Sequence, residues 1–188
     1  MEVPLTGKGA ARDIVSYSAL SSPDPLLPAL ASIDNINDRR HVTSLVHEHK
    51  LVQWEKDPSF FTSEANHLVR DIHGMFRRVF RSVAVECDTC PADGEKWIQS
   101  FQTYNEMLHH HHSIEDKWWF PRLCAAHPSI KHHLAVLELD HKDLVALERR
   151  ILAADKLALR EFVGFLEDHL NREEILTVPL LIDGSGGM

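Results

Sequence analysis

Four long segments of the chain repeat apolar residues at intervals of three and four, the pattern typical of amphipathic helices. We expect these helices over about residues 63–86, 94–120, 128–154 and 155–178. Ser63 and Asp155 are residue types that cap helix N-termini, which supports the first and fourth starts. No segment alternates convincingly between apolar and polar residues, as a half-buried strand would. Four helices with short links predict an all-α fold, an up-down-up-down four-helix bundle.

The chain outside this pattern divides into two flanks. Residues 1–60 have weaker periodicity, and we expect an N-terminal arm with one short helix, over about residues 37–56, packed on the bundle. The bundle itself is expected over residues 61–182. Residues 183–188, with the sequence DGSGGM, are expected to form a flexible tail.

Composition and charge argue against several classes of protein. The formal net charge is -8, which disfavours nucleic acid or an anionic membrane as a partner, because both attract basic surfaces. No run approaches the roughly 18–20 apolar residues that a membrane span needs. The N-terminus lacks the basic-then-apolar layout of a signal peptide, and three cysteines are too few for a disulfide framework. We therefore expect a soluble, cytoplasmic protein.

Two segments, on the predicted second and fourth helices, repeat one arrangement of residues that can bind metals. HHSIEDKWWFPRL, from His111, and HLNREEILTVPLL, from His169, each contain His-x-x-x-Glu, a second acid, and a proline ten residues after the histidine. Residues four apart share one helix face, so each pair aims an imidazole and a carboxylate at the same point. His111 with Glu115 and His169 with Glu173 therefore predict a metal site in the bundle, whose carboxylates can bridge two ions.

The spacing also selects one histidine from the run of four at residues 109–112. Glu115 follows His111 by four residues, whereas the neighbours of His111 point about 100° to either side of it. The other three histidines of the run are therefore expected on the surface or behind the ligands: His109, His110 and His112.

The first and third helices are expected to supply further ligands. Histidine is the commonest metal ligand, and 14 of the 188 residues are histidine. His141 interrupts an otherwise apolar stripe of the third helix. On the first helix His73 lies deeper than its competitor His67, so we expect His73 at the middle of the bundle.

The pattern H…HxxxE…H…HxxxE on four helices resembles the hemerythrin-like HHE cation-binding domain. The form HHHHxxE[DE]xxxFP is similar to its fungal members in particular, and the resemblance extends over about residues 63–181. It implies a non-heme di-iron site that handles dioxygen, with zinc or manganese as substitutes for iron. The ligands that it implies, with both glutamates bridging, are His73, His111, Glu115, His141, His169 and Glu173.

Two positions depart from the oxygen-carrying hemerythrins, which place two histidines four apart on the third helix and bridge with an aspartate five residues after the last histidine. Here Leu137 and Val145 stand four residues from His141, and Glu174 stands at the aspartate position. One iron is thus expected to lack a nitrogen ligand, unless His112 or Glu138 supplies the missing group. An open coordination position favours activation of dioxygen, or access of a substrate, over pure carriage.

These observations leave three hypotheses for function. The first is a di-iron oxidase or oxygenase that activates dioxygen and acts on a small molecule. The second is a module for iron or oxygen sensing, carrying or storage, without turnover. The third is a bundle whose histidines hold structural zinc or no metal. A ferritin-like site fits less well, because that class uses Glu-x-x-His, in the reverse order and at a different spacing.

Overall fold

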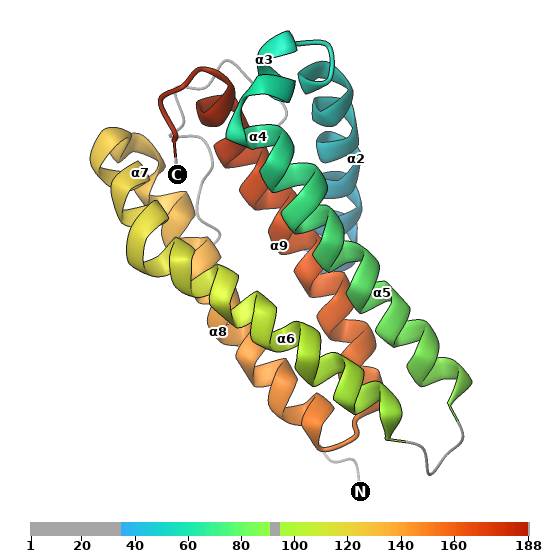
Figure 1. Cartoon of the computed structure of the whole chain (residues 1–188). Coiled ribbons are helices and arrows are strands. Elements are labelled where there is room, and N and C mark those ends of the chain that lie inside the picture. Colours follow the sequence, from blue (N-terminus) through green and yellow to red (C-terminus); the bar gives the residue numbers. More distant parts are fainter. Residues whose placement is uncertain (1–34, 91–94, 188) are drawn as a thin grey trace, which may run out of the picture.

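The structure, a computed structural model, describes residues 35–90 and 95–187. Within these residues the chain forms helices and no strand (Figure 1), which confirms the predicted all-α class. None of the helices in this part of the chain is both long and apolar enough to cross a membrane.

Four long helical segments make the bundle, and two of them contain a π-helical turn. The first and second segments are each built from three consecutive elements, whereas the third and fourth are single helices. In chain order the elements are α4 (Glu64–Asn66), the π-helix η2 (His67–His73), α5 (Gly74–Thr89), α6 (Lys96–Ile114), the π-helix η3 (Glu115–Trp119), α7 (Phe120–Ala126), the 3-10 turn η4 (Pro128–Ile130), α8 (Lys131–Leu152) and α9 (Lys156–Ile182).

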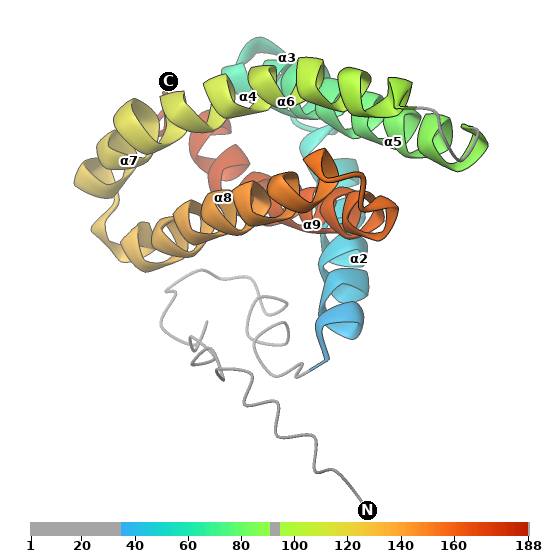
Figure 2. The ribbon, with the colours of Figure 1, turned by 90° about the horizontal axis from the view of Figure 1, so that it is seen from below.

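The helices are arranged in two layers. In Figure 2 the first two segments, with α5 and α6, lie above α8 and α9. Successive helices run in opposite directions, so the up-down-up-down topology is confirmed. The predicted caps are also present: the Ser63 hydroxyl accepts a hydrogen bond from the Ala65 amide at 3.3 Å, and a carboxylate oxygen of Asp155 accepts one from the Leu157 amide at 3.0 Å.

Two predicted helix ends were too early. The second segment was expected to end near residue 120 and the fourth near residue 178, but they continue to Ala126 and Ile182. Pro121 and Pro179 directly follow the predicted ends, and each is part of a helix. Pro121 lies in the first turn of α7, directly after the π-helix η3.

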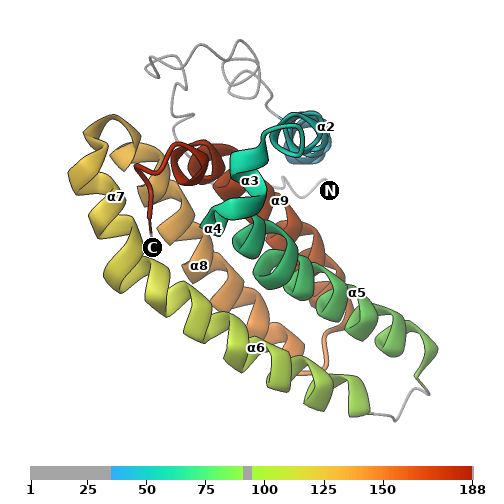
Figure 3. The same ribbon diagram turned by 45° about the horizontal axis from the view of Figure 1, so that its top comes forward.

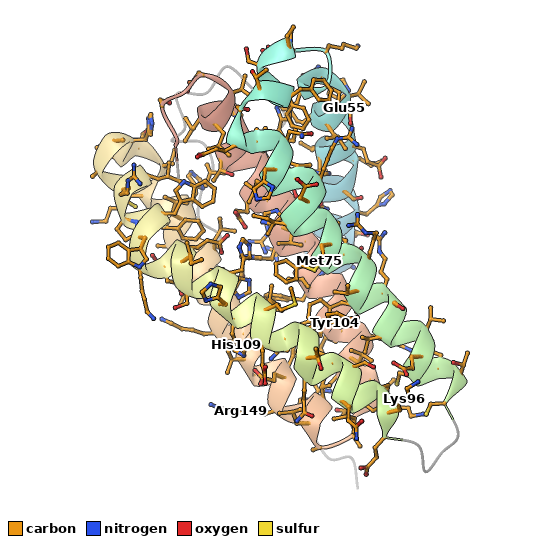
Figure 4. The ribbon with its side chains drawn as sticks, in the orientation of Figure 1. Glu55, Met75, Lys96, Tyr104, His109 and Arg149 are labelled. Atoms are coloured by element: carbon orange, nitrogen blue, oxygen red, sulfur yellow. The ribbon has the colours of Figure 1, made fainter. Side chains whose placement is uncertain are left out.

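A layer of polar side chains divides the apolar core into two parts. One part surrounds Phe80, Phe101 and Phe162, whose ring centroids lie 5.1–5.7 Å apart, and Met75 and Tyr104, labelled in Figure 4, pack against it. Each buried aromatic or aliphatic side chain stabilises the fold by roughly 1.5–3 kcal/mol. This packing fixes the four helices at the level of the polar layer.

The second part of the core lies on the other side of the polar layer. It contains Trp119, Phe120 and Leu137 with parts of α4, η2 and α9. Residues 183–187, expected as part of a flexible tail, contact this end of the bundle: the indole nitrogen of Trp119 donates a hydrogen bond to the Gly186 carbonyl at 3.0 Å. The polar layer is therefore closed off by apolar packing above and below.

An additional helix precedes the bundle, as expected from the sequence. It is α2 (Ile36–Trp54), followed by the short α3 (Pro58–Thr62). Figure 3 shows α2 beside the upper parts of α5 and α9, and Val46 of α2 packs against Ile175 of α9. The expected arm before this helix falls mostly in residues 1–34, which lie outside the described residues, as does residue 188 at the end of the tail.

Candidate metal centre

The polar layer contains two groups of side chains that converge on neighbouring points. His73, His111, Glu115 and Glu173 form the first group, in which each residue offers one nitrogen or oxygen atom and all four atoms lie within 4.8 Å of one another. The Nε2 atoms of His73 and His111 are 3.2 Å apart. Oε1 of Glu115 lies 2.9 Å from Nε2 of His111.

The second group consists of His112, Glu115, His141 and His169, and all four residues are buried. The Nε2 atoms of His141 and His169 are 3.2 Å apart. The His112 ring stacks on the His141 ring, with centroids 3.9 Å apart. Two nitrogens bound at about 2.1 Å to one metal ion lie roughly 3.0–3.4 Å apart, so the spacing within both groups fits one shared cation for each.

The two groups share carboxylates. Glu115 belongs to both: its Oε1 faces His111, and its Oε2 lies 3.5 Å from Nε2 of His141. Glu173 also lies between them, since its Oε2 is 3.5 Å from Nε2 of His73 and 3.8 Å from Nε2 of His169. Each carboxylate can therefore bridge two cations held by the two sets of histidines.

The π-helical turns coincide with this layer. His73 is the last residue of η2 and Glu115 is the first residue of η3. Such turns insert an extra residue into a helix, change the direction of its side chains and occur frequently at functional sites. On the second segment, Glu115 follows His112 by three residues and His111 by four, so its carboxylate lies between the two imidazoles.

Three of the histidines are oriented by carboxylates on their other ring nitrogen. Nδ1 of His73 lies 2.8 Å from Glu174, and Nδ1 of His141 lies 2.9 Å from Asp116. Nδ1 of His169 lies 3.4 Å from Asp140. A proton on Nδ1 that is donated to the acid leaves Nε2 as an acceptor, the form that ligates a metal. The Nε2 atoms of His141 and His169 are therefore two acceptors brought together, an arrangement that a cation stabilises.

A further set of residues holds these acids in place. Arg77 donates to Glu174 at 2.7 Å, and Arg172 lies 2.7 Å from Asp140 and 2.9 Å from Asp168. Glu174 also forms a hydrogen bond with His47, which comes from α2 and is 8% exposed. The N-terminal helix thus contributes directly to the network that orients His73.

Acidic side chains outnumber basic ones in this region, and two divalent cations would neutralise the difference. Two guanidinium groups, from Arg77 and Arg172, oppose six carboxylates, so with all six ionised, as cation binding requires, the set would carry four negative charges in excess. Buried charges are stable only when they are paired or coordinate a metal. The carboxylates in this set are Glu115, Asp116, Asp140, Asp168, Glu173 and Glu174.

Orphaned polar atoms support the same conclusion. Both carboxylate oxygens of Glu115, both of Glu173 and Nε2 of His112 are buried, and none of them has a hydrogen-bond partner among the residues that the structure describes. Buried polar atoms without partners are rare, and they require an explanation. Imidazole nitrogens and carboxylate oxygens together suit a transition-metal cation, so the donor set fits the implied metals.

In the protein without a metal ion, burial determines the protonation state of these groups. It raises the pKa of Glu115 and Glu173 well above the usual range of a carboxyl. It also lowers the pKa of His111 to about 4 and that of His112 and His169 well below the usual value for histidine. The imidazoles are thus neutral and ready to ligate, and a cation would be bound with release of the carboxyl protons.

Glu174 behaves in the opposite way. Burial alone would raise the pKa of this carboxyl, but hydrogen bonds with His47 and His73 and the positive charge of Arg77 outweigh burial and hold its pKa below the usual range. The negative charge of Glu174 is therefore fixed, and it orients His73 instead of facing the cation positions.

The structure brings together all six residues proposed as ligands from the sequence and adds one. His112 was expected on the surface or behind the ligands, with a place at the metal only as a replacement for a missing nitrogen donor; in the structure it belongs to the second group, three residues before Glu115. The other residues considered as less favoured ligands lie elsewhere. His67 is exposed and pairs with Asp71, Glu138 lies near Cys124, and Glu174 forms the hydrogen bonds described above.

The addition of His112 gives a specific prediction. We expect His112→Ala to weaken binding of the second cation by more than the roughly 10–100-fold that loss of an outer hydrogen-bond partner costs. His110→Ala is the matched control, because His110 belongs to the same run and is exposed. Iron content after anaerobic loading and desalting measures the effect. Two retained ions in both variants would show that His112 is not a ligand.

Comparison with known proteins agrees with this geometry. The family model described as the hemerythrin HHE cation-binding domain matches residues 64–183, which contain every residue of the two groups. No curated protein matches the chain, and no solved structure does. The likeness to fungal members of the family stays a prediction. Because the match covers more than half of the chain, the chain belongs to the hemerythrin HHE cation-binding domain family.

Proposed function

We propose that the protein holds two iron ions in the two groups and that it binds and activates dioxygen. The observation that carries the proposal is the position of Glu115, whose two oxygens face different sets of histidines. A shared carboxylate holds two cations close together, and two-metal sites have separations of about 3.5–4 Å. Two ferrous ions held by these residues would supply electrons for the reduction of dioxygen.

The donor types favour iron. Two histidines with carboxylates and open positions are typical of non-heme ferrous sites that react with oxygen. The first group offers two imidazoles and two carboxylates, whereas the second offers three imidazoles and the shared carboxylate of Glu115. Zinc or manganese would compete for the same donors, because affinity alone does not select iron.

The two groups differ in their number of imidazole donors, and this difference supports activation of dioxygen. The sequence predicted that one ion would lack a nitrogen donor on the third helix, and His112 supplies a donor near His141 from the second segment instead. The first group still has only two imidazoles, so its cation has more positions for dioxygen. The Phe76 ring, 5.3 Å from the His111 ring, covers this side and limits water.

Access to the centre bears on the choice between oxidase and carrier. A pocket of about 330 Å³ is lined by His112, Asp116, Lys117, His141 and Lys142, so a small polar substrate could approach the second group from the surface. Both groups are otherwise enclosed, since His73 and Glu173 of the first group and His169 of the second are 0% exposed. That enclosure favours the alternative function, in which the protein senses, carries or stores iron or oxygen without turnover.

Measurement of oxygen uptake distinguishes these functions. Ferrous-loaded protein is mixed with air-saturated buffer, the dissolved oxygen is followed, and the sample is then placed under vacuum. We expect oxygen to be consumed, ferric iron to form and no oxygen to return under vacuum. Full recovery of oxygen over repeated cycles, with the iron still ferrous, would identify a carrier and contradict activation.

A further inference from the structure

A groove of about 410 Å³ lies between α2 and α5, with residues of α9 in its wall. It is separate from the pocket beside His112, and Arg77, His47 and Asn171 are part of its inner wall. Four arginines of the first helical segment line it: Arg70, Arg77, Arg78 and Arg81.

Three of these arginines are held by acids or amides. Arg70 pairs with Glu55 and Arg81 pairs with Glu167. The guanidinium of Arg77 points inward: it donates to Glu174 at 2.7 Å and to the side-chain oxygen of Asn171 at 2.9 Å. These contacts fix the positions of three guanidinium groups before any ligand arrives. Such preorganisation lowers the entropy cost of binding.

The fourth arginine differs. Arg78 forms no ion pair with any residue that the structure describes. Its guanidinium lies back over Gly74, because a Cβ atom at that position would be only 3.2 Å from a terminal nitrogen of Arg78. Because Gly74 has no side chain, the groove has room for the guanidinium of Arg78. The donors of this guanidinium have no carboxylate partner among the described residues.

Most of the arginine charge in the groove is balanced by acids. Glu55, Glu174 and Glu167 pair with Arg70, Arg77 and Arg81. Arg78 is thus the arginine of the lining whose charge no described ion pair balances. An unpaired guanidinium in a concavity attracts anions to that place.

We propose that this groove binds a small molecule that carries a phosphate group. Guanidinium groups match phosphate oxygens with paired, charge-assisted hydrogen bonds, and Arg78 supplies unpaired donors. The volume of the groove suits a small organic ligand, and Ser44 and Asn171 add polar groups to its lining. The proposal does not depend on which metal the centre holds, although Arg77 connects the groove to Glu174.

Calorimetric titration of the iron-loaded, full-length protein with glycerol 3-phosphate tests the proposal. We expect saturable binding that weakens with salt and falls about 10-fold in Arg78→Gln, the loss of one charge-assisted contact. Arg149→Gln, which changes an exposed arginine of α8 outside the groove (Figure 4), should bind as the wild type does. Iron content is measured in each sample, so that a failure of the metal centre is recognised separately.

Three results would overturn the proposal. They are the absence of saturable binding, equal affinity in Arg78→Gln and wild type, and equal losses in both arginine variants. Phosphate bound by the iron itself would give the second of these results. A parallel experiment uses phosphatidylcholine vesicles that contain phosphatidic acid. Vesicle capture that needs Arg78, without binding of glycerol 3-phosphate, would assign the groove to a lipid headgroup and contradict a soluble ligand.

Discussion

Replacement of Glu115 by alanine is expected to remove both cations from the protein. Its two oxygens face His111 and His141 at 2.9 and 3.5 Å, so each cation would lose a ligand and the bridge between them. Glu173→Ala is expected to have the same effect, because Glu173 also lies between the two groups. Iron content after anaerobic loading, with a baseline of two ions per chain, measures the loss.

The control for this prediction is His109→Ala. His109 (Figure 4) lies on the same helical segment, is exposed and pairs with Glu148 at 2.8 Å, so its loss should leave both ions in place. One ion retained by Glu115→Ala would mean that the carboxylate belongs to a single site. Equal losses in all three variants would mean that the wrong face of the helix has been identified.

The variant Glu115→Gln shows whether iron is lost because a ligand is missing or because the protein fails to fold. Because burial raises the pKa of Glu115 in the folded protein, this carboxyl destabilises the cation-free fold above its unfolded pKa, and the penalty shrinks as the pH falls. Glutamine does not ionise and removes the penalty. We therefore expect cation-free Glu115→Gln to be more stable than wild type at neutral pH, while it binds less iron.

Removal of the cations from the wild-type protein is expected to cause the largest change in stability. A ligand at roughly 100 times its dissociation constant stabilises a fold by about 2.7 kcal/mol, so two cations would contribute about 5 kcal/mol. For a chain of this size that corresponds to a fall of about 10–20 °C in melting temperature on chelation. Calorimetry with and without a chelator provides the measurement.

This stabilisation should depend on pH with a defined sign. Protons compete with the cations for Glu115 and Glu173, whose pKa values are raised by burial, so the cations stabilise more as the pH rises and less as it falls. Glu115→Ala should show no response to the chelator. An unchanged melting temperature for the wild type after complete removal of metal would contradict a metal centre that supports the fold.

The bundle and most of its centre followed from periodicity in the sequence. His111 with Glu115 and His169 with Glu173 were predictable because residues four apart share a helix face, which depends only on local geometry. His73 could be chosen over His67 because residues near the middle of a bundle helix reach its axis. The structure agrees, with His73 buried and His67 exposed.

His112 was considered only as a replacement for a missing nitrogen donor, because the prediction allowed one ligand direction for each glutamate. Glu115 lies within reach of residues three and four before it, and η3 begins at this residue. The pair His112 and Glu115, three residues apart, was the available signal. A π-helical turn shifts side chains by one position, and no simple pattern in the sequence marks it.

His47 could not have been found from local patterns. It lies 127 residues from Glu174 in the chain, and the contact depends on how α2 packs against α9. It also lies outside residues 64–183, the part that the family model matches. Contacts between distant segments depend on the tertiary fold and leave no periodic trace. Asp140, which meets His169 from the neighbouring helix α8, was missed for the same reason.

An anomalous-scattering map at the iron edge, from crystals of the iron-loaded protein, tests the central claim most directly. We expect two peaks per chain about 3.5–4 Å apart. One should lie between His73 and His111, and the other among His112, His141 and His169. A single peak, or peaks bound only by the exposed histidines, would contradict a two-cation centre bridged by Glu115.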